Sequence, residues 1–389
     1  MERVLSFLAK ETRATEYYKS FKYCFEGVEV PTVLYDDKQH IVFTDDKSGE
    51  TDKKSKNSRS LEKLAKRLQS DGKPLFKYFL DGSRRTYKVD DIAYGNRVYP
   101  VIAGQIGVGC CERKSPDSVK MARLESYLAL SLPACANKDN SSDDLFFNAL
   151  TSKINEMPVL KRHNLNFQRI LRYESNKELK EGEKYEHKGI AKIQDEMVEA
   201  EKKLVNQLVK DKKLNFDSYL LKDGSIEYKS MKNGDFKDLA SIKSNYQCVV
   251  GVSKSFNPEL CKDYKGKSIA KNIADLPLFH RTPAYKYRTE RIPGVEFSVW
   301  YLRVRDIKQT ISPFDGVLKI EKILITDAEH EKGLNSEEID RISANLINER
   351  NPTCYGADNR WANHLYPVYL TENFIKSRYL SDVYFLNLF

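Results

Sequence analysis

One short sequence occurs twice in this chain, each time after a run of residues typical of a β-strand. The first copy, FKYFLDGSRRTYKV, contains Asp81, and the second, DSYLLKDGSIEYKS, contains Asp223. Between the copies, IQDEMVEAEKKLVNQLV has apolar residues at helical spacing and predicts a long amphipathic helix. A strand, a packed helix and a second strand are units of an α/β domain, so we expect a mixed sheet flanked by helices.

The segment after residue 74 carries the strongest strand signals. FKYFLDGS, RTYKVDDIAY and YPVIAGQIGVGCCERK predict three successive strands, and the third is apolar enough to be buried on both faces. We therefore expect one mixed α/β domain over residues 75–389, with helical insertions, and an N-terminal appendage over residues 1–74. Within the appendage, residues 46–60 are polar and charged without apolar periodicity, which predicts a mobile loop.

Three acidic residues are candidates for chemistry: Asp81, Glu201 and Asp223. Asp-Gly between strand-like runs also predicts a hairpin turn, because both residues tolerate positive φ, so each aspartate has a structural alternative. Glu201 lies on or beside the apolar stripe of its helix, where a carboxylate is costly unless it is paired or bound to a metal. If the three carboxylates converge, their hard oxygen atoms suit Mg²⁺ or Mn²⁺ in a two-metal site that acts on phosphodiesters.

Lys254 directly follows the apolar run YQCVVGVS, which predicts another buried strand. A lysine in this position can offset negative charge on a transferring phosphate, or it can be the solvated end of a strand. The sequence contains no GxSxG, no P-loop and no HExxH motif. It therefore has no motif for a serine hydrolase, a nucleotide-driven motor or a zinc protease.

Composition limits the partners and the cellular compartment. Lys and Arg number 65 against 56 Asp and Glu, a net charge of +9 that suits a polyanion such as DNA without requiring one. The 7 cysteines are scattered, without CxxC pairs, which favours a reducing compartment and argues against structural zinc. Because no signal peptide and no apolar run near 18 residues is present, we expect a cytoplasmic protein without membrane contact.

The order of these motifs resembles the NurA nuclease family. The matching segments are LDGS at 80–83, the helix around Glu201, LLKDGS at 220–225 and LYPVYLTENF at 365–374. GVSK at 251–254 and FSVWYLRV at 297–304 are similar to further family segments, so the resemblance spans roughly residues 75–380.

The resemblance implies an RNase H-like fold and a DNA nuclease that depends on Mn²⁺ or Mg²⁺. Asp81, Glu201 and Asp223 would then be metal ligands, and Tyr366 would match a C-terminal family tyrosine. Where the family has a histidine soon after Tyr-Pro, this chain offers Glu372 as a fourth ligand, with His364 as another candidate.

The resemblance also implies partners: a second copy of the chain in a homodimer and a hexameric ATPase of the HerA type that translocates DNA. DNA repair and antiviral defence are both open as biological roles. The alternative is a catalytically silent nucleic-acid-binding or scaffold subunit of such a complex. The two hypotheses differ in whether the carboxylates converge.

Overall fold

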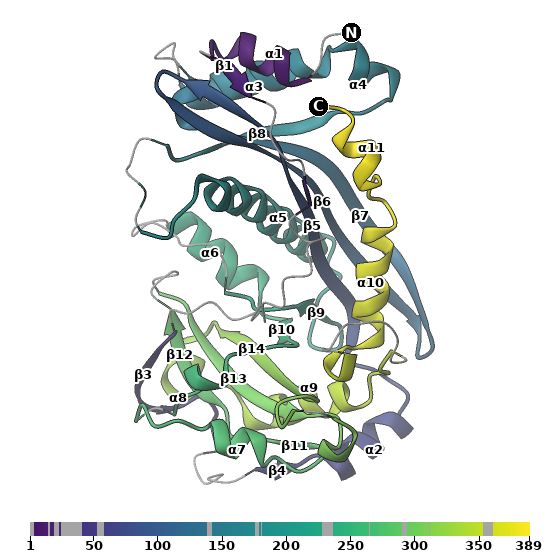
Figure 1. The fold of residues 1–389 in the computed structure, drawn as a ribbon. Helices are drawn as coiled ribbons and strands as arrows, with labels where there is room; N and C mark the ends of the chain where they lie inside the picture. The colour runs from purple at the N-terminus through teal and green to yellow at the C-terminus, as the bar shows by residue number, and fades with distance from the viewer. Residues whose placement is uncertain are drawn as a thin grey trace.

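A large mixed sheet with helices on both faces runs through the computed structural model of the chain (Figure 1). The structure describes residues 4–14, 16–18, 23–24, 41–52, 58–137, 142–175, 179, 181–227, 236–263, 265–289, 294–310, 312–352 and 361–389.

The centre of the sheet consists of β5 (Phe76–Tyr94), β6 (Arg97–Ser115) and β7 (Ser118–Pro133), which follow one another in the chain and pair antiparallel. On the other side of β5 lies β9 (Tyr219–Asp223), parallel to β5, and then β10 (Val249–Ser253), parallel to β9. Three antiparallel strands joined to two parallel ones form an RNase H-like sheet. The predicted fold class is confirmed.

Further strands extend the sheet beyond this centre. β8 (Phe167–Tyr173) pairs parallel with β7, and beyond β10 the sheet continues antiparallel through β14 (Val317–Leu324), β13 (Glu296–Arg303), β12 (Tyr285–Thr289) and β3 (Ile41–Ser48). The short strands at its margins are β1 (Glu16–Tyr18), β2 (Tyr23–Cys24), β4 (Arg59–Ser60) and β11 (His280–Arg281).

The described helices are α1 (Val4–Glu11), α2 (Glu62–Ser70), α3 (Asp143–Asn155), α4 (Pro158–Arg162), α5 (Tyr185–Lys210), α6 (Phe236–Asn245), α7 (Ala270–Ala274), α8 (Asp327–Lys332), α9 (Ser336–Ile347), α10 (Tyr366–Lys376) and α11 (Asp382–Leu386). Short 3-10 turns occur at Ala134–Ala136, Pro258–Leu260, Ile307–Gln309 and Trp361–Asn363.

Helices α5 and α10 lie on opposite sides of β5 and β6 (Figure 1). Glycines in β6 let both helices approach closely: a Cβ at Gly104 would lie 2.7 Å from Ile193 of α5, and one at Gly109 would lie 2.9 Å from Ile375 of α10. Because side chains alternate along a strand, even positions of this part of β6 face α5 and odd positions face α10. This alternation decides on which face of the sheet each candidate residue lies.

The structure corrects the prediction for the first Asp-Gly-Ser copy. FKYFLDGS and RTYKVDDIAY are not two strands, because β5 runs unbroken through Asp81 and Gly82 over 19 residues. Asp81 pairs with Gly109 and Gly82 with Val108 across the ladder to β6, so no hairpin turn forms there. At the second copy, β9 ends at Asp223 and Gly224 has φ of 78°, so a turn does follow.

The prediction of a mobile loop over residues 46–60 is wrong wherever the structure describes this segment. β3 extends to Ser48, and Glu50 is fully buried, with its Oε2 2.9 Å from an Nη of Arg281. The charge of Glu50 is therefore paired inside the protein rather than solvated. Residues 53–57 lie outside the described residues. The boundary at residue 74 stays a prediction, although β3, which precedes it, pairs with β12.

Candidate active site

Asp81 lies within β5, five residues after the strand begins, on the face that α10 covers. Phe79, two residues earlier, packs in the same buried cluster as Leu365 and Val368 from the start of α10, and side chains two apart on a strand share a face. Only 6% of Asp81 is exposed. The strand pairing of β5 with both β6 and β9 therefore places one carboxylate inside the sheet rather than at its edge.

Asp223 and Lys254 lie beside Asp81 at the ends of the two neighbouring parallel strands. β9 pairs with β5 through Leu80 and Lys222, so its next residue, Asp223, is beside Asp81. Lys254 follows β10, and its Nζ lies 2.8 Å from Oδ2 of Asp223. Lys254 is only 6% exposed, so it is not the solvated strand end that the sequence left open.

Glu372 reaches the same place from α10. Its Oε2 lies 4.0 Å from Nζ of Lys254, and its Oε1 accepts a hydrogen bond of 2.6 Å from Lys376, one turn along the helix. Burial opposes ionisation of Glu372, but Lys254 and Lys376, with His364, lower its pKa below the ordinary value. Glu372 is thus a carboxylate held in its charged form next to Asp223 and Lys254.

Electrostatics link these groups into one cluster, which we call the acid cluster: Asp81, Asp223, Glu372 and Lys254. Burial raises the pKa of Asp81 well above its ordinary value, and Asp223, Glu372 and Glu201 act in the same direction. Lys254 opposes them. Carboxylates outnumber the ammonium group at this place, and such an excess of buried negative charge is costly without further cations.

Glu201 approaches from the opposite face of the sheet. Helix α5 carries it, and its Oε1 is 2.5 Å from where a Cβ at Gly82 would stand. Its Oε2 pairs with Nζ of Lys222 at 3.3 Å, and both side chains are buried. Glu201 is therefore the paired, buried glutamate that the helix pattern predicts. Because Gly82 has no side chain, this carboxylate can reach the strand that carries Asp81.

Tyr366 is at the first turn of α10, where it lines a pocket and is 38% exposed. Its catalytic role stays a prediction.

Two supporting residues were not predicted from the sequence. Lys222 forms an ion pair with Glu201, and the side-chain amide of Asn363 donates a hydrogen bond of 2.6 Å to the backbone carbonyl of Lys254. Lys222 directly precedes Asp223 in a strand, so alternation predicts that the two side chains lie on opposite faces of the sheet. No local signal in the sequence points to Asn363.

The donor chemistry of the acid cluster fits a divalent cation, because aspartate and glutamate supply the hard oxygen atoms that Mg²⁺ and Mn²⁺ prefer. The arrangement is less complete. Within the part of the chain that the structure describes, no group of three or more His, Cys, Asp or Glu side chains is placed to hold a metal ion. The ammonium group of Lys254 lies between Asp223 and Glu372 instead.

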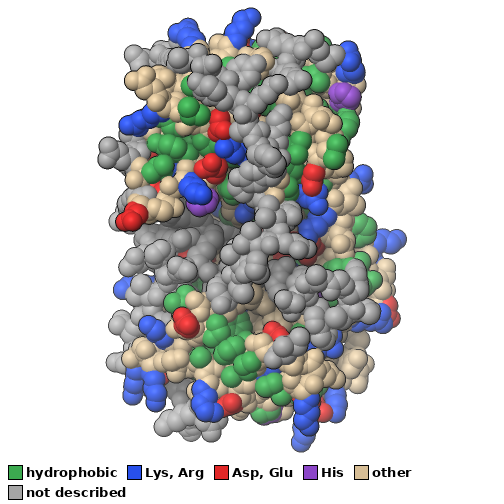
Figure 2. Space-filling model, viewed as in Figure 1, with side chains coloured by type: hydrophobic (Ala, Val, Ile, Leu, Met, Phe, Trp, Pro, Cys, Tyr) green, Lys and Arg blue, Asp and Glu red, His purple; other side chains and the backbone are tan. Residues whose placement is uncertain are grey.

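Basic side chains are scattered among acidic and apolar ones on the face shown in Figure 2, where they form no single stripe. Phosphate binding by the described residues of this face would therefore be weak and sensitive to salt. Among the described residues, no helix combines the length and the apolar character needed to cross a lipid bilayer.

Comparisons with known proteins find little. No protein family model matches the chain, and no curated protein matches it. Among solved structures, the NurA nuclease from Sulfolobus solfataricus is similar, with 10% sequence identity and a TM-score of 0.34. The match covers 81% of this chain and 87% of that chain. A likeness at this level leaves the function to be argued from the residues themselves.

Proposed function

We propose that this protein is a divalent-metal-dependent nuclease that hydrolyses phosphodiester bonds in DNA. The observation that carries the proposal is the acid cluster. Carboxylates from β5, β9 and α10, separated in the sequence by more than a hundred residues at each step, lie around one buried lysine. Asp81 has a raised pKa because of burial and of like charges nearby, which marks a site where a cation would be favourable.

In this proposal each residue of the cluster has a separate task. Asp81, Asp223 and Glu372 would hold the cations, and Glu201 would support them from the other face at Gly82. Lys254 would leave Asp223 and offset negative charge on the phosphate. When bound, two such cations polarise the phosphoryl group and activate water.

One observation favours a second candidate, a catalytically silent nucleic-acid-binding or scaffold subunit. Lys254 and Lys222 each pair with a carboxylate of the site, and in the described residues no ready-made metal group exists. A protein that had lost its cations could keep its fold through such ion pairs. The two candidates differ in whether a metal displaces Lys254.

The motif order supports the remaining parts of the proposal. They are a homodimer, a cytoplasmic location and a role in DNA repair or antiviral defence together with a HerA-type hexameric ATPase. The ATPase would supply the movement along DNA, because this chain has no P-loop. The scattered basic side chains on the face in Figure 2 give a reason for such help, because a translocating partner raises the local concentration of DNA at the site.

The test is a cleavage assay on linear and circular DNA with Mn²⁺, Mg²⁺ or a chelator, alone and with a candidate ATPase and ATP. We expect metal-dependent cleavage that Asp81→Asn and Asp223→Asn each reduce by about a thousandfold or more, as for catalytic groups that act as a unit. Asp217→Asn is the matched control, because Asp217 lies just before β9 with its side chain 91% exposed. Cleavage that survives Asp81→Asn, or that is absent under every condition, would refute the nuclease.

A further inference from the structure

One buried asparagine connects two of the elements that carry the acid cluster. Asn363 belongs to the 3-10 turn Trp361–Asn363, three residues before α10 begins at Tyr366, and only 6% of it is exposed. Its side chain bonds to the chain at the end of β10 and at the start of β14. The contacts of this amide therefore influence how α10 meets the strand end that carries Lys254.

The amide of Asn363 uses both of its N–H groups and its oxygen. Its Nδ2 donates to the backbone carbonyls of Lys254, at 2.6 Å, and of Val317, at 2.9 Å. Its Oδ1 accepts a hydrogen bond of 2.5 Å from the backbone N–H of Gly316. The orientation of the amide is fixed by these partners, because turning it over would place its oxygen against two carbonyl oxygens.

These bonds continue the sheet at the point where two of its strands separate. The ladder between β10 and β14 ends where Ser253 pairs with Lys319, two residues after β14 begins at Val317. Beyond this pair, Asn363 bonds one carbonyl on each side of the gap. Because a buried carbonyl without a partner costs free energy, this amide stabilises the exit of the chain from β10.

The backbone that Asn363 holds is that of the ammonium group in the acid cluster. Lys254 is 6% exposed, and its Nζ lies 2.8 Å from Oδ2 of Asp223 and 4.0 Å from Oε2 of Glu372. A lysine side chain is a flexible four-carbon stem, so the region that its ammonium group can reach depends on where the backbone stands. The hydrogen bond to the carbonyl of Lys254 fixes that origin.

The same amide sets the start of α10, the helix that carries Glu372. Leu365, two residues after Asn363, packs in the buried cluster beneath the helix. Farther along α10, the hydroxyl of Thr371 donates to the backbone carbonyl of Phe79 on β5, at 3.4 Å. Helix α10 is therefore held to the sheet beside Glu372 and just before its own first turn. Asn363 joins this second attachment directly to the end of β10.

We propose that Asn363 is a positioning residue of the acid cluster, which holds the backbone of Lys254 against the start of α10 and so keeps its ammonium group between Asp223 and Glu372. In this role Asn363 acts through Lys254 and makes no contact with the substrate. The inference rests on the proposed function for the task of Lys254, which is to offset negative charge on the phosphate. It adds the residue that determines where this charge can reach, 109 residues away in the sequence.

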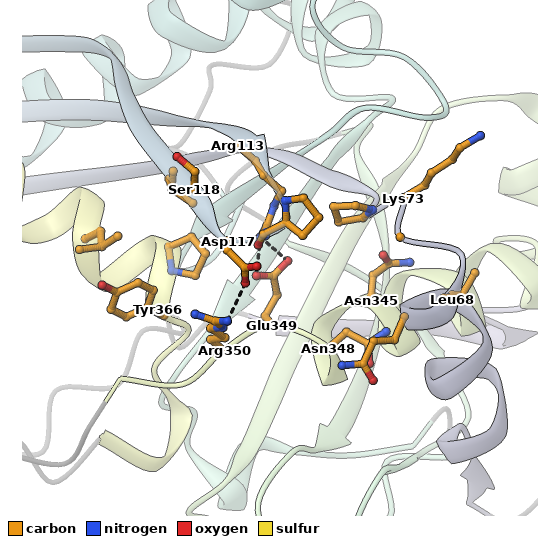
Figure 3. Close-up of a pocket in the computed structure, with 17 residues that line it drawn as sticks. Leu68, Lys73, Arg113, Asp117, Ser118, Asn345, Asn348, Glu349, Arg350 and Tyr366 are labelled. Carbon is orange, nitrogen blue, oxygen red and sulfur yellow. Dashed lines mark hydrogen bonds and ion pairs between the residues drawn. The ribbon is translucent and has the colours of Figure 1, made fainter.

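Asn345 offers a matched control, because it is a second buried amide bound to the backbone. It is 5% exposed, its Oδ1 accepts 2.9 Å from the N–H of Leu75, and its Nδ2 donates 2.9 Å to the carbonyl of Arg341. It lies in the wall of the pocket drawn in Figure 3, whose lining residues include none of the acid cluster. Asn345→Ala should therefore destabilise the protein in the same way as Asn363→Ala while leaving the cluster in place.

The first measurement follows Lys254 itself and needs no cleavage. The folded protein is reductively methylated in chelator, and mass spectrometry gives the rate of modification of each lysine. In the Asn363→Ala protein, Lys254 should react about tenfold faster than in wild type, the scale of one lost buried hydrogen bond. Lys222, 5% exposed on the other face of the sheet, should stay protected, because the change is local. Asn345→Ala should leave both lysines protected.

The second measurement is a double-mutant cycle on cleavage at saturating Mn²⁺, below the melting temperature of every variant. Asn363→Ala should lower kcat by about tenfold with KM for DNA nearly unchanged, because Lys254 contributes in the transition state. In the Lys254→Met background, Asn363→Ala should lower kcat no further, since the group that it positions is gone. Asn345→Ala should keep the kcat of wild type.

Three results would overturn the positioning role. They are an unchanged modification rate of Lys254 in the Asn363→Ala protein, an equal loss of protection at Lys254 and Lys222, and additive losses of kcat in the cycle with Lys254→Met. The two proposals fail separately. Release of Lys254 alone, without cleavage by any form of the protein, removes the nuclease alone, whereas metal-dependent cleavage with Lys254 still protected removes the positioning role alone.

Discussion

The two Asp-Gly-Ser segments are the same tripeptide in two different structures. At Asp81 the chain continues as a strand through Gly82, whereas at Asp223 the strand ends and Gly224 turns with φ of 78°. The first glycine serves a close approach, because a Cβ there would meet Glu201 at 2.5 Å. The second serves a backbone conformation that L-residues avoid. Identical local sequence therefore says little about why a glycine is present.

The two segments are also held by different means. β6 pairs with the first along its whole length. A buried carboxylate on β14 anchors the second segment. Oε2 of Glu321 accepts hydrogen bonds from the hydroxyl of Ser225, at 2.7 Å, and from the backbone N–H of Ile226, at 3.1 Å. Lys319 pairs with the other oxygen at 3.0 Å. The sheet therefore positions both aspartates, and the buried Lys319–Glu321 pair additionally holds the turn that follows Asp223.

Glu321→Gln should give the largest loss of stability, because it leaves the buried ammonium of Lys319 without its counter-charge. We expect the free energy of unfolding to fall by about 3 kcal/mol at neutral pH, as when one partner of a buried ion pair is removed. Urea unfolding of both proteins measures it. An equal loss from Asp217→Asn, on the exposed surface before β9, would show that the assay does not report the anchor.

The same substitution has a predictable pH dependence. Burial acts to raise the pKa of Glu321, but Lys319, Ser225 and Ile226 together lower it below its ordinary 4.5. A lowered pKa contributes stability that is present above 4.5 and lost as the pH falls through the folded value. The difference in free energy of unfolding between wild type and Glu321→Gln should therefore become smaller as the pH is lowered. A constant difference down to low pH would contradict the anchor.

Gly82→Ala should destabilise the protein less than Glu321→Gln does, but it should also displace Glu201 and so disturb the candidate active site. The new Cβ displaces the end of Glu201, and overpacking of this kind costs about 1–3 kcal/mol. Glu201→Ala is itself destabilising because it leaves the buried Lys222 without its partner, but in that background Gly82→Ala should cost little more, since the obstructing atoms are gone, and cleavage should stay lost. Calorimetry of the single and double variants, with the cleavage assay alongside, checks both parts. If Gly82→Ala costs as much in the Glu201→Ala background as in wild type, Gly82 is present for another reason.

Gly224→Ala should cost about 1–2 kcal/mol through its left-handed backbone alone. The atom closest to a Cβ there is Nζ of Lys222, at 4.0 Å, so no side chain obstructs it. Gly224→Asn, a residue that tolerates this conformation, should lose less than Gly224→Ala. If the two variants were equally destabilised, the conformational account of Gly224 would be wrong.

Asp81→Asn should give the smallest change in stability, and of opposite sign to Glu321→Gln. Burial and Asp223 raise the pKa of Asp81, so its charged form destabilises the metal-free fold increasingly as the pH rises above 3.8. Removing the charge relieves this, although the attraction to Lys254 is lost with it. In chelator at neutral pH the variant should melt slightly above wild type, and Mn²⁺ should stabilise wild type only. A lower melting temperature of the variant in chelator would contradict the electrostatic account.

The sequence is informative where the pattern repeats over many residues. The apolar stripe of α5 and the strand runs of β5, β6 and β10 predict the mixed α/β class, and the stripe also predicts that Glu201 is buried. These signals sum over a whole element, so single exceptions do not alter them.

The sequence fails where a distant partner decides the local structure. Asp-Gly favours a turn, and only pairing with β6 keeps Asp81 in a strand. Glu50 belongs to a polar segment, and only Arg281, 231 residues away, makes it a core residue. Helical spacing places Glu201 on a packed face, yet it does not tell which side of the sheet α5 covers. Glu372 and Asn363 join the site only through the way α10 docks.

The most direct test of the acid cluster is a crystal structure grown with Mn²⁺ and measured for anomalous scattering. We predict anomalous peaks at coordination distance from the carboxylates of Asp81 and Asp223, with Nζ of Lys254 moved away from its present 2.8 Å contact. The same crystals of the Asp81→Asn protein should lose these peaks. A map without Mn²⁺ at these carboxylates, with Lys254 still bound to Asp223, would contradict the metal site and leave a silent subunit as the better account.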